Sequence, residues 1–221
     1  MAIILLASCD KDVSEYSPTP YSLQTPSHFP QMNIPADNPF TVEGITLGRK
    51  LFYEEMLSGD NTMSCATCHD PSAGFSDSDQ FSQGITGELG RRNSMALVNM
   101  GWQQFFFWDG RAATLEEQIF IPVTDPLEMN ETWPNAIHKL EHTAGYKKMF
   151  YQAFGTYGID SVKVSKAIAQ FIRTMISSNS QYDILYKEKN GFTLSAEEQA
   201  IFNSISIDAR EGYNSFESLT G

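Results

Sequence analysis

The chain has few of the residues that build disulfide frameworks, zinc sites or membrane spans. Its 221 residues include only three cysteines and four histidines. The one conspicuous apolar run near the start, residues 2–7, is far shorter than the ~20 residues that a membrane-spanning helix needs. Basic residues number 15 against 27 acidic ones, and the resulting net charge of −12 makes nucleic acid an unfavourable partner. The length is sufficient for one large domain, or for one domain and part of another.

Two of the three cysteines lie close together and are followed directly by a histidine. Cys65 and Cys68 enclose two residues and His69 comes next, which is the attachment signature of c-type haem. Each sulfur would add across one haem vinyl group, and His69 would ligate the iron. The alternatives are a zinc half-site and a thioredoxin-like redox pair. Zinc needs a second Cys/His pair, whereas the remaining Cys9 lies far upstream, and a redox pair normally lies in a βαβ setting that is missing here.

Residues 1–9 read as the remnant of an export signal. The last four of them, ending in Cys9, resemble a bacterial lipobox, in which the cysteine becomes the lipidated first residue. The positively charged start of a full signal peptide is missing, so we expect the true N-terminus to lie elsewhere. The alternative is a buried N-terminal strand with an incidental cysteine. Because covalent haem c is assembled after export, both signals predict a periplasmic lipoprotein with no thiol left for a disulfide.

Residues 10–38 are rich in proline, serine and threonine, which is typical of a tether between an anchor and a domain. His28 lies in this stretch, and we expect it to be exposed. Downstream, the caps and apolar periodicity predict helices. Thr41 is a half-made N-cap, and Gly48 would let another helix cross closely. The predicted helices cover residues 41–57, 114–120, 133–142, 146–154, 162–177 and a segment from 195 onward.

The stretch from residue 70 to 90 is rich in glycine, serine and aspartate and predicts a long loop around a haem edge. His138 and His142 share one helix face, and a solvated pair is favoured there over a metal site. Residues 212–216 repeat the Gly-x-x-x-Phe spacing of residues 48–52. A second cytochrome-like unit is therefore predicted to begin near residue 186 and to stop before a haem motif of its own.

Several motifs stand in a fixed order along the chain: LGRKLF at 47–52, LSGD at 57–60, SCATCH at 64–69, RNS at 92–94 and FWDGR at 107–111. With them the chain resembles the N-terminal part of the bacterial di-haem cytochrome c peroxidase/MauG family, from about residue 38 to 221. The resemblance implies a mainly α fold with long loops: a cytochrome-c-like haem domain over residues 39–185 and the truncated start of a second one over 186–221.

The resemblance also implies roles for individual residues. Glu128 would be the distal carboxylate that moves protons during cleavage of the peroxide O–O bond, with Gln118 and Pro122 lining the same face. Trp108 would bridge the two haems, and Asn93 would contribute its side-chain oxygen to a calcium ion. The plainer alternatives are that Trp108 belongs to the core, Glu128 is an exposed acid and Asn93 is a turn residue.

The chain departs from the family pattern in two respects. The loop at residues 70–90 contains no histidine that could close the haem, so either the site is open or a residue such as Met95 or Met100 caps it. The second haem motif is missing, so one haem is expected in this chain and another in the full-length protein.

The resemblance implies reduction of hydrogen peroxide to water, with electrons from a small redox protein such as a cytochrome c or a cupredoxin, in a protein that forms a homodimer. A MauG-like oxidase of a protein or small-molecule substrate and a mono-haem electron carrier are the alternative functions.

Overall fold

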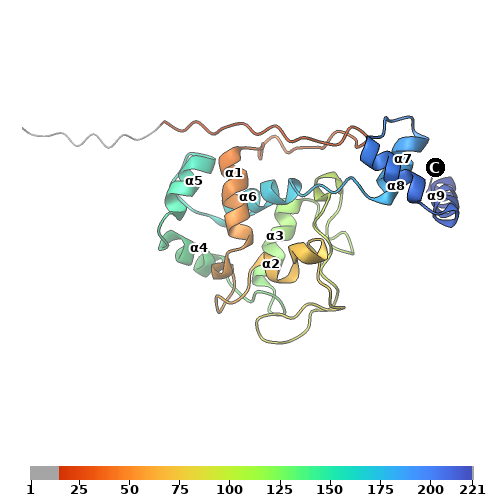
Figure 1. The fold of residues 1–221 in the computed structure, drawn as a ribbon. Coiled ribbons are helices and arrows are strands. Elements are labelled where there is room, and N and C mark those ends of the chain that lie inside the picture. Colours follow the sequence, from red (N-terminus) through yellow and green to blue (C-terminus); the bar gives the residue numbers. More distant parts are fainter. Residues whose placement is uncertain (1–14, 221) are drawn as a thin grey trace, which may run out of the picture.

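The computed structural model describes residues 15–220, and within them the regular structure is helical, with isolated bridges in place of strands. Figure 1 shows the helices gathered into a main body, with α7–α9 beside it. The α-helices are α1 (Val42–Phe52), α2 (Cys65–Cys68), α3 (Leu115–Thr124), α4 (Trp133–Glu141), α5 (Tyr146–Phe154), α6 (Ser161–Arg173), α7 (Gln181–Lys189), α8 (Ala196–Ser204) and α9 (Ile207–Thr220). Short 3₁₀ turns are η1 (Glu55–Leu57), η2 (Pro71–Ala73) and η3 (Met100–Trp102).

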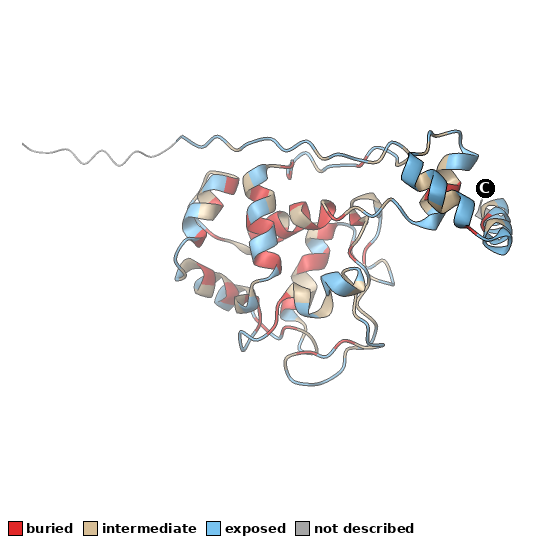
Figure 2. Ribbon diagram, viewed as in Figure 1, coloured by how far each residue is buried: buried red, intermediate tan, exposed pale blue. Residues whose placement is uncertain are grey.

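The crossing of α1 over α6 forms the centre of the main body. Thr41 caps α1 as predicted, since its hydroxyl accepts a hydrogen bond from the Gly44 amide at 3.0 Å. Gly48 lies against α6 so closely that an added Cβ would stand 1.9 Å from the Ala167 carbonyl oxygen. Leu51 and Phe52 on the same side of α1 are fully buried. Figure 2 shows the buried residues concentrated where these helices meet.

Helix α3 is longer than the predicted segment that ends near Phe120. Thr114 caps it, accepting a hydrogen bond from the Glu117 amide at 3.1 Å. Pro122 does not end the helix, which continues to Thr124. A proline in the last turn removes only one backbone bond, and the carbonyls of Pro122 and Val123 accept hydrogen bonds from the amides of residues 129 and 131. Helices α4 and α5 form where they were expected, whereas α6 ends at Arg173, short of the predicted residue 177. Helix α1 likewise ends at Phe52, and the rest of the segment predicted to residue 57 contains the 3₁₀ turn η1.

Helix α7 was not predicted, although Ser180 and Asp183 make a reciprocal capping box at its start. Leu185 of this helix packs with Ile205 and Tyr213 in a small second hydrophobic cluster. The capping box at Ser195 forms as expected, but the helix that it opens ends at Ser204 and a second helix, α9, follows from Ile207. The predicted domain boundary between residues 185 and 186 falls inside α7, and the division into domains stays a prediction.

Residues 15–38 form an extended segment, which we call the strap. It runs along the outside of the main body from α5 towards α7 (Figure 1). Tyr16 donates to the Ala153 carbonyl at 3.1 Å, and the indole of Trp102 donates to the Pro30 carbonyl at 2.8 Å. His28 is not exposed, contrary to our expectation. Its side chain is only 5% exposed and lies 3.4 Å from an Asp183 oxygen, so the strap connects to α7.

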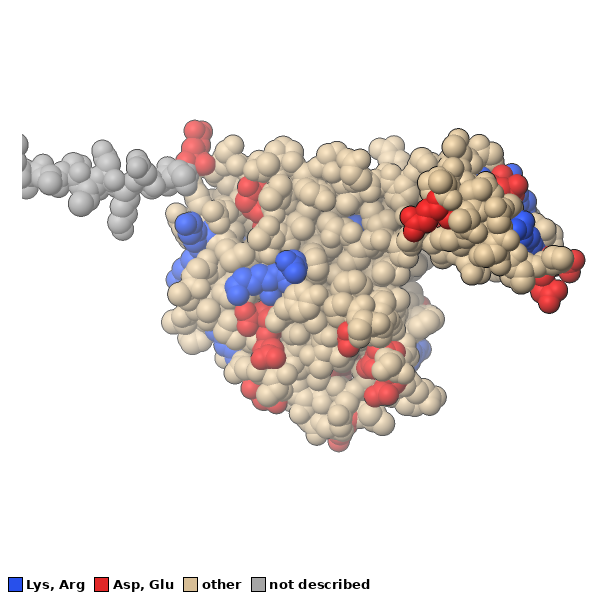
Figure 3. Space-filling view, in the orientation of Figure 1, with Lys and Arg blue, Asp and Glu red and all other residues tan. Residues whose placement is uncertain are grey.

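Acidic side chains are dispersed over both the main body and the α7–α9 end on the face shown in Figure 3. In the part of the chain that the structure describes, no helix has the length and apolar composition needed to cross a bilayer. The lipobox and Cys9 lie outside the described residues.

Candidate haem-binding site

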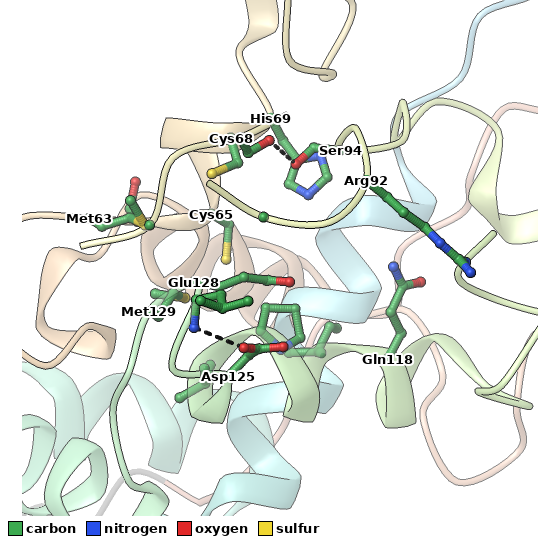
Figure 4. A pocket seen from close by; sticks show the side chains of 18 of the residues that line it. Met63, Cys65, Cys68, His69, Arg92, Ser94, Gln118, Asp125, Glu128 and Met129 are labelled. Carbon is green, nitrogen blue, oxygen red and sulfur yellow. Dashed lines mark hydrogen bonds between the residues drawn. The ribbon is translucent and has the colours of Figure 1, made fainter. Parts of the chain in front are cut away.

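A cavity of about 580 Å³ opens between α2, α3, α6 and the loops that join them. This volume is within the usual range for cofactor pockets. Ile168 and Ile172 of α6, together with Phe52 of α1, give it an apolar wall. Figure 4 shows the polar and sulfur-bearing side chains that face it. Six of the predicted site residues line this cavity: Cys65, Cys68, His69, Gln118, Pro122 and Glu128.

The two cysteines reach the cavity from a single helical turn. The hydroxyl of Thr67 accepts from the Ser64 amide at 3.1 Å and fixes the start of α2. The His69 amide then donates to the Cys65 carbonyl at 3.0 Å, so the histidine directly follows the turn. Its Nδ1 donates to the Phe75 carbonyl at 3.1 Å. Because a carbonyl only accepts, Nδ1 carries the proton and Nε2 keeps the lone pair that an iron ion needs.

The surroundings of Cys65, Cys68 and His69 differ from those that a redox-active cysteine pair or a zinc site would need. Burial raises the pKa of Cys65 to about 12 and also raises that of Cys68, whereas a redox-active CxxC pair lowers a thiol pKa. Burial lowers the pKa of His69, which keeps the imidazole neutral as a ligand must be. Within residues 15–220 no three Cys, His, Asp or Glu side chains cluster as a zinc site would require. The donor set therefore fits covalent haem c: two sulfurs at one edge and one imidazole.

Glu128 enters the cavity from a turn after α3. Its amide donates to the Asp125 carbonyl at 3.0 Å, and the Asp125 carboxylate accepts from the Leu127 amide at 2.9 Å. Gly84 packs against this turn, where an added Cβ would stand 2.1 Å from the Leu127 carbonyl oxygen. The amide of Ile85 donates to the Glu128 carbonyl at 3.0 Å. Burial, reinforced by the negative charge of Asp125, raises the pKa of Glu128, so it is not the exposed acid of the plainer alternative.

Gln118 lies one turn before Pro122 on α3, which places both on the side of the helix that faces the cavity. Gln118 is 8% exposed, and its Oε1 is buried with no hydrogen-bond partner among the described residues. Its Nε2 contacts the sulfur of Met95 at 3.7 Å. A buried amide oxygen normally finds a donor, so this atom fits a site that receives a small hydroxylic ligand.

Two predicted residues lie together outside the cavity lining. Trp108 is 64% exposed, so it is not a core residue, and its indole donates to the Asn93 carbonyl at 3.0 Å. The side-chain nitrogen of Asn93 donates to the backbone carbonyls of Asp77 and Asp79, at 3.1 and 2.7 Å. This geometry leaves the Asn93 side-chain oxygen as the atom that a cation would use.

Several lining residues were not singled out from the sequence. Met63 and Met129 line the cavity, whereas the two methionines considered as caps, Met95 and Met100, are not among its lining residues.

A cationic rim was also missed. Arg92 and Arg111 line the cavity and share Asp109, at 3.2 and 3.0 Å. Arg92 belongs to the RNS motif at 92–94 and Arg111 to the FWDGR motif at 107–111, so the family resemblance could have pointed to both. They can pair with the carboxylates of a bound haem.

The fold and the cavity together fit a c-type haem protein, since Cys65, Cys68, His69 and the buried acid Glu128 line one cavity. The family model "Di-haem cytochrome c peroxidase" matches residues 42–191, and the chain belongs to this family. The mainly α, cytochrome-c-like fold is confirmed by the helices of the described residues and by the solved structure of a MauG-like protein compared below.

Individual relatives agree. The chain is 37% identical over 149 residues to the methylamine utilization protein MauG of Methylophilus methylotrophus, covering 67% of this chain and 44% of that protein. It is 33% identical over 180 residues to the cytochrome c peroxidase Ccp of Escherichia coli K12, covering 81% of this chain and 38% of that protein. A solved structure of a MauG-like protein associated with microbial copper homeostasis superposes with a TM-score of 0.70 at 31% identity. The superposition covers 81% of this chain and 53% of that chain. The chain thus spans about half the length of these relatives, or less.

Proposed function

We propose that this chain is the peroxide-reacting haem domain of a periplasmic di-haem peroxidase, which reduces hydrogen peroxide to water. The observation that supports it best is the shared cavity. The attachment residues Cys65, Cys68 and His69 line the same cavity of about 580 Å³ as the acid Glu128 and the amide Gln118. An electron carrier needs the first set of residues, but it has no use for a buried acid in the cavity that would hold its haem.

When bound, the haem supplies the iron that accepts the peroxide and the electrons. The protein's contribution is attachment through both cysteines, ligation through His69 Nε2 and proton transfer through Glu128. The overall reaction consumes one hydrogen peroxide, two electrons and two protons and yields two waters. With the haem in place, Glu128 would take a proton from peroxide in the cavity and give it to the departing peroxide oxygen, a role suited to a buried carboxyl whose pKa is raised. Gln118 Oε1 orients the peroxide by accepting its second O–H.

Electrons come from a small redox protein, a cytochrome c or a cupredoxin, through a second haem in the full-length protein. Trp108, which is exposed and directly precedes the cavity-lining Asp109, would carry them between the haems. Asn93, whose carbonyl binds the Trp108 indole, contributes its side-chain oxygen to a calcium ion in the same region. A lipid anchor on Cys9 holds the protein at the periplasmic membrane face, and the full-length protein forms a homodimer.

A MauG-like oxidase is the second candidate. It is supported by the similarity to MauG proteins, at 37% and 38% identity. The same cavity serves both candidates. They differ in what the oxidised haem reacts with: a peroxidase takes electrons from a donor protein, whereas a MauG-like oxidase takes them from a protein or small-molecule substrate.

The test is the rate at which peroxide changes the haem spectrum in Glu128→Gln, with Glu88→Gln as the matched control. Glu88 is an exposed carboxylate of the loop before residue 90 that does not line the cavity. We expect a loss of about 10²-fold or more in Glu128→Gln, which is the usual contribution of a positioned acid–base group, and no loss in the control. Equal rates in both variants would refute the role of Glu128, and no reaction in the wild type would refute the peroxidatic site.

A further inference from the structure

Two of the four histidines lie side by side on the outer face of α4, at its C-terminal end. His138 and His142 are four residues apart, so they leave the helix on one side, one turn from each other. Their ring centroids are 4.1 Å apart, with the planes tilted by 32°. Both residues are exposed, whereas Ala136 and Leu140 on the opposite face of α4 are fully buried. Packing of the helix therefore does not use either imidazole.

One hydrogen bond fixes the tautomer of the second histidine. His142 Nδ1 lies 2.7 Å from the His138 backbone carbonyl oxygen. Since that oxygen only accepts, Nδ1 carries the proton and the lone pair is on Nε2. This arrangement is typical of metal-binding histidines, in which a hydrogen bond at one nitrogen orients the other towards the ion. His69 shows the same arrangement with the Phe75 carbonyl inside the haem cavity.

The other histidines are not available to an ion from solution. All four lie in the described part of the chain, and His28 is buried against Asp183 while His69 lines the haem cavity. None of the described cavity-lining residues belongs to α4, which Figure 1 places at the outer edge of the main body. The pair on α4 is thus separate from the haem site. The net charge of −12 also raises the concentration of cations near the surface.

We propose that His138 and His142 form a surface binding site for a divalent transition-metal ion, with Cu²⁺ preferred over Ni²⁺ and Zn²⁺. Imidazole nitrogens suit all three ions, and the general order of affinities places Cu²⁺ first. No third Cys, His, Asp or Glu completes a cluster within residues 15–220. The ion is therefore held by two protein nitrogens and by water, which makes the site open and exchangeable.

The test is a Cu²⁺ titration of the haem-loaded full chain, produced without a histidine tag. Every variant carries Cys9→Ser, which removes the proposed lipid anchor as well as any unlipidated Cys9 thiol that would compete for the ion. The thioether links of Cys65 and Cys68 remove the other thiols. Calorimetry gives the stoichiometry, and the Cu²⁺ paramagnetic resonance spectrum gives the number of coordinating nitrogens. We expect one equivalent bound with a two-nitrogen signature, and weaker binding of Ni²⁺ and Zn²⁺.

His138→Gln and His142→Gln should each weaken binding on the order of 10²-fold, because one ligand of a chelating pair is lost. The matched control is Glu141→Gln, which removes a neighbouring negative charge and keeps both imidazoles; its affinity should be unchanged. An unaltered circular dichroism spectrum verifies that the variants fold. The proposal is overturned if the wild type shows no saturable binding, if the single histidine variants bind as tightly, or if Glu141→Gln loses as much affinity as they do.

Discussion

The close crossing of α1 and α6 leads to a quantitative prediction for Gly48→Ala. The new Cβ would stand 1.9 Å from the Ala167 carbonyl oxygen and 2.5 Å from its carbon, and both atoms belong to the backbone. Relief requires the two helices to move apart, and overpacking of this kind costs about 1–3 kcal/mol. The higher helix propensity of alanine returns at most about 1 kcal/mol. Because both crowded atoms belong to the backbone, we take the upper part of the overpacking range, about 2–3 kcal/mol. The expected net loss is then roughly 1–3 kcal/mol, or a melting temperature lowered by roughly 2–12 °C.

Gly212→Ala is the matched control, because Gly212 occupies the equivalent place in the second copy of the Gly-x-x-x-Phe spacing. Nothing lies within 4 Å of the Cβ that alanine would add there. The same substitution should stabilise α9 by up to about 1 kcal/mol through helix propensity alone. The assay is urea unfolding of the haem-loaded protein, followed by circular dichroism and by haem absorbance. A Gly48→Ala protein as stable as the wild type would refute the close crossing.

Three further predictions concern contacts between distant parts of the chain. Arg173→Met should cost about 3 kcal/mol at neutral pH, the lower end of the range for a broken buried ion pair. It removes the two hydrogen bonds of 2.7 and 2.9 Å that hold the Glu116 carboxylate and leaves Asn38, at 2.7 Å, as the remaining side-chain donor. Burial alone would raise the pKa of Glu116, but the interaction with Arg173 outweighs burial and lowers this pKa from 4.5. The ion pair therefore stabilises the fold above pH 4.5 and loses this effect at lower pH. Urea unfolding should show the stabilities of the variant and the wild type converging as the pH falls below 4.5. Trp108→Phe should change stability by less than about 0.5 kcal/mol and leave the haem spectrum intact, while slowing electron delivery in the full-length protein, measured by stopped flow; an unchanged rate would contradict the bridge. His28→Gln should loosen the strap from Asp183 and speed proteolysis within residues 15–38 with no change in the haem spectrum, and unchanged cleavage would show that this contact is dispensable.

The local parts of the fold could be predicted because their signals lie within a few residues of each other. The caps at Thr41, Thr132 and Ser195 each place a hydroxyl three residues before the amide it accepts from, so the sequence shows both partners. Gly48 predicted that some helix would cross closely, but no local pattern identified that helix as α6. The His28–Asp183 contact joins residues 155 positions apart, and no local pattern announces it. Helix α3 extends past Pro122 because backbone amides from a later segment satisfy its last carbonyls.

The candidate site likewise contains some residues that the sequence predicts and others that it does not. The attachment motif is contiguous, so Cys65, Cys68 and His69 follow from spacing, and the family resemblance supplied Gln118, Pro122 and Glu128. The helical spacing of four places Gln118 and Pro122 on one face of α3. The missed residues, such as Met63, Met129 and the arginine rim, reach the cavity from separate loops. The two arginines belong to family motifs, but that any of these side chains reaches this cavity depends on tertiary packing, which no local pattern encodes.

The most direct test of the haem assignment is made on the chain produced in a periplasm with haem maturation. Its intact mass should correspond to one covalently attached haem, and the mass increment should be lost when Cys65 and Cys68 are both replaced by alanine. The ferric absorption spectrum should be high-spin and should change promptly when peroxide is added. A low-spin spectrum indifferent to peroxide would contradict an open peroxidatic site, and a chain without covalent haem would contradict the account from its attachment motif onward.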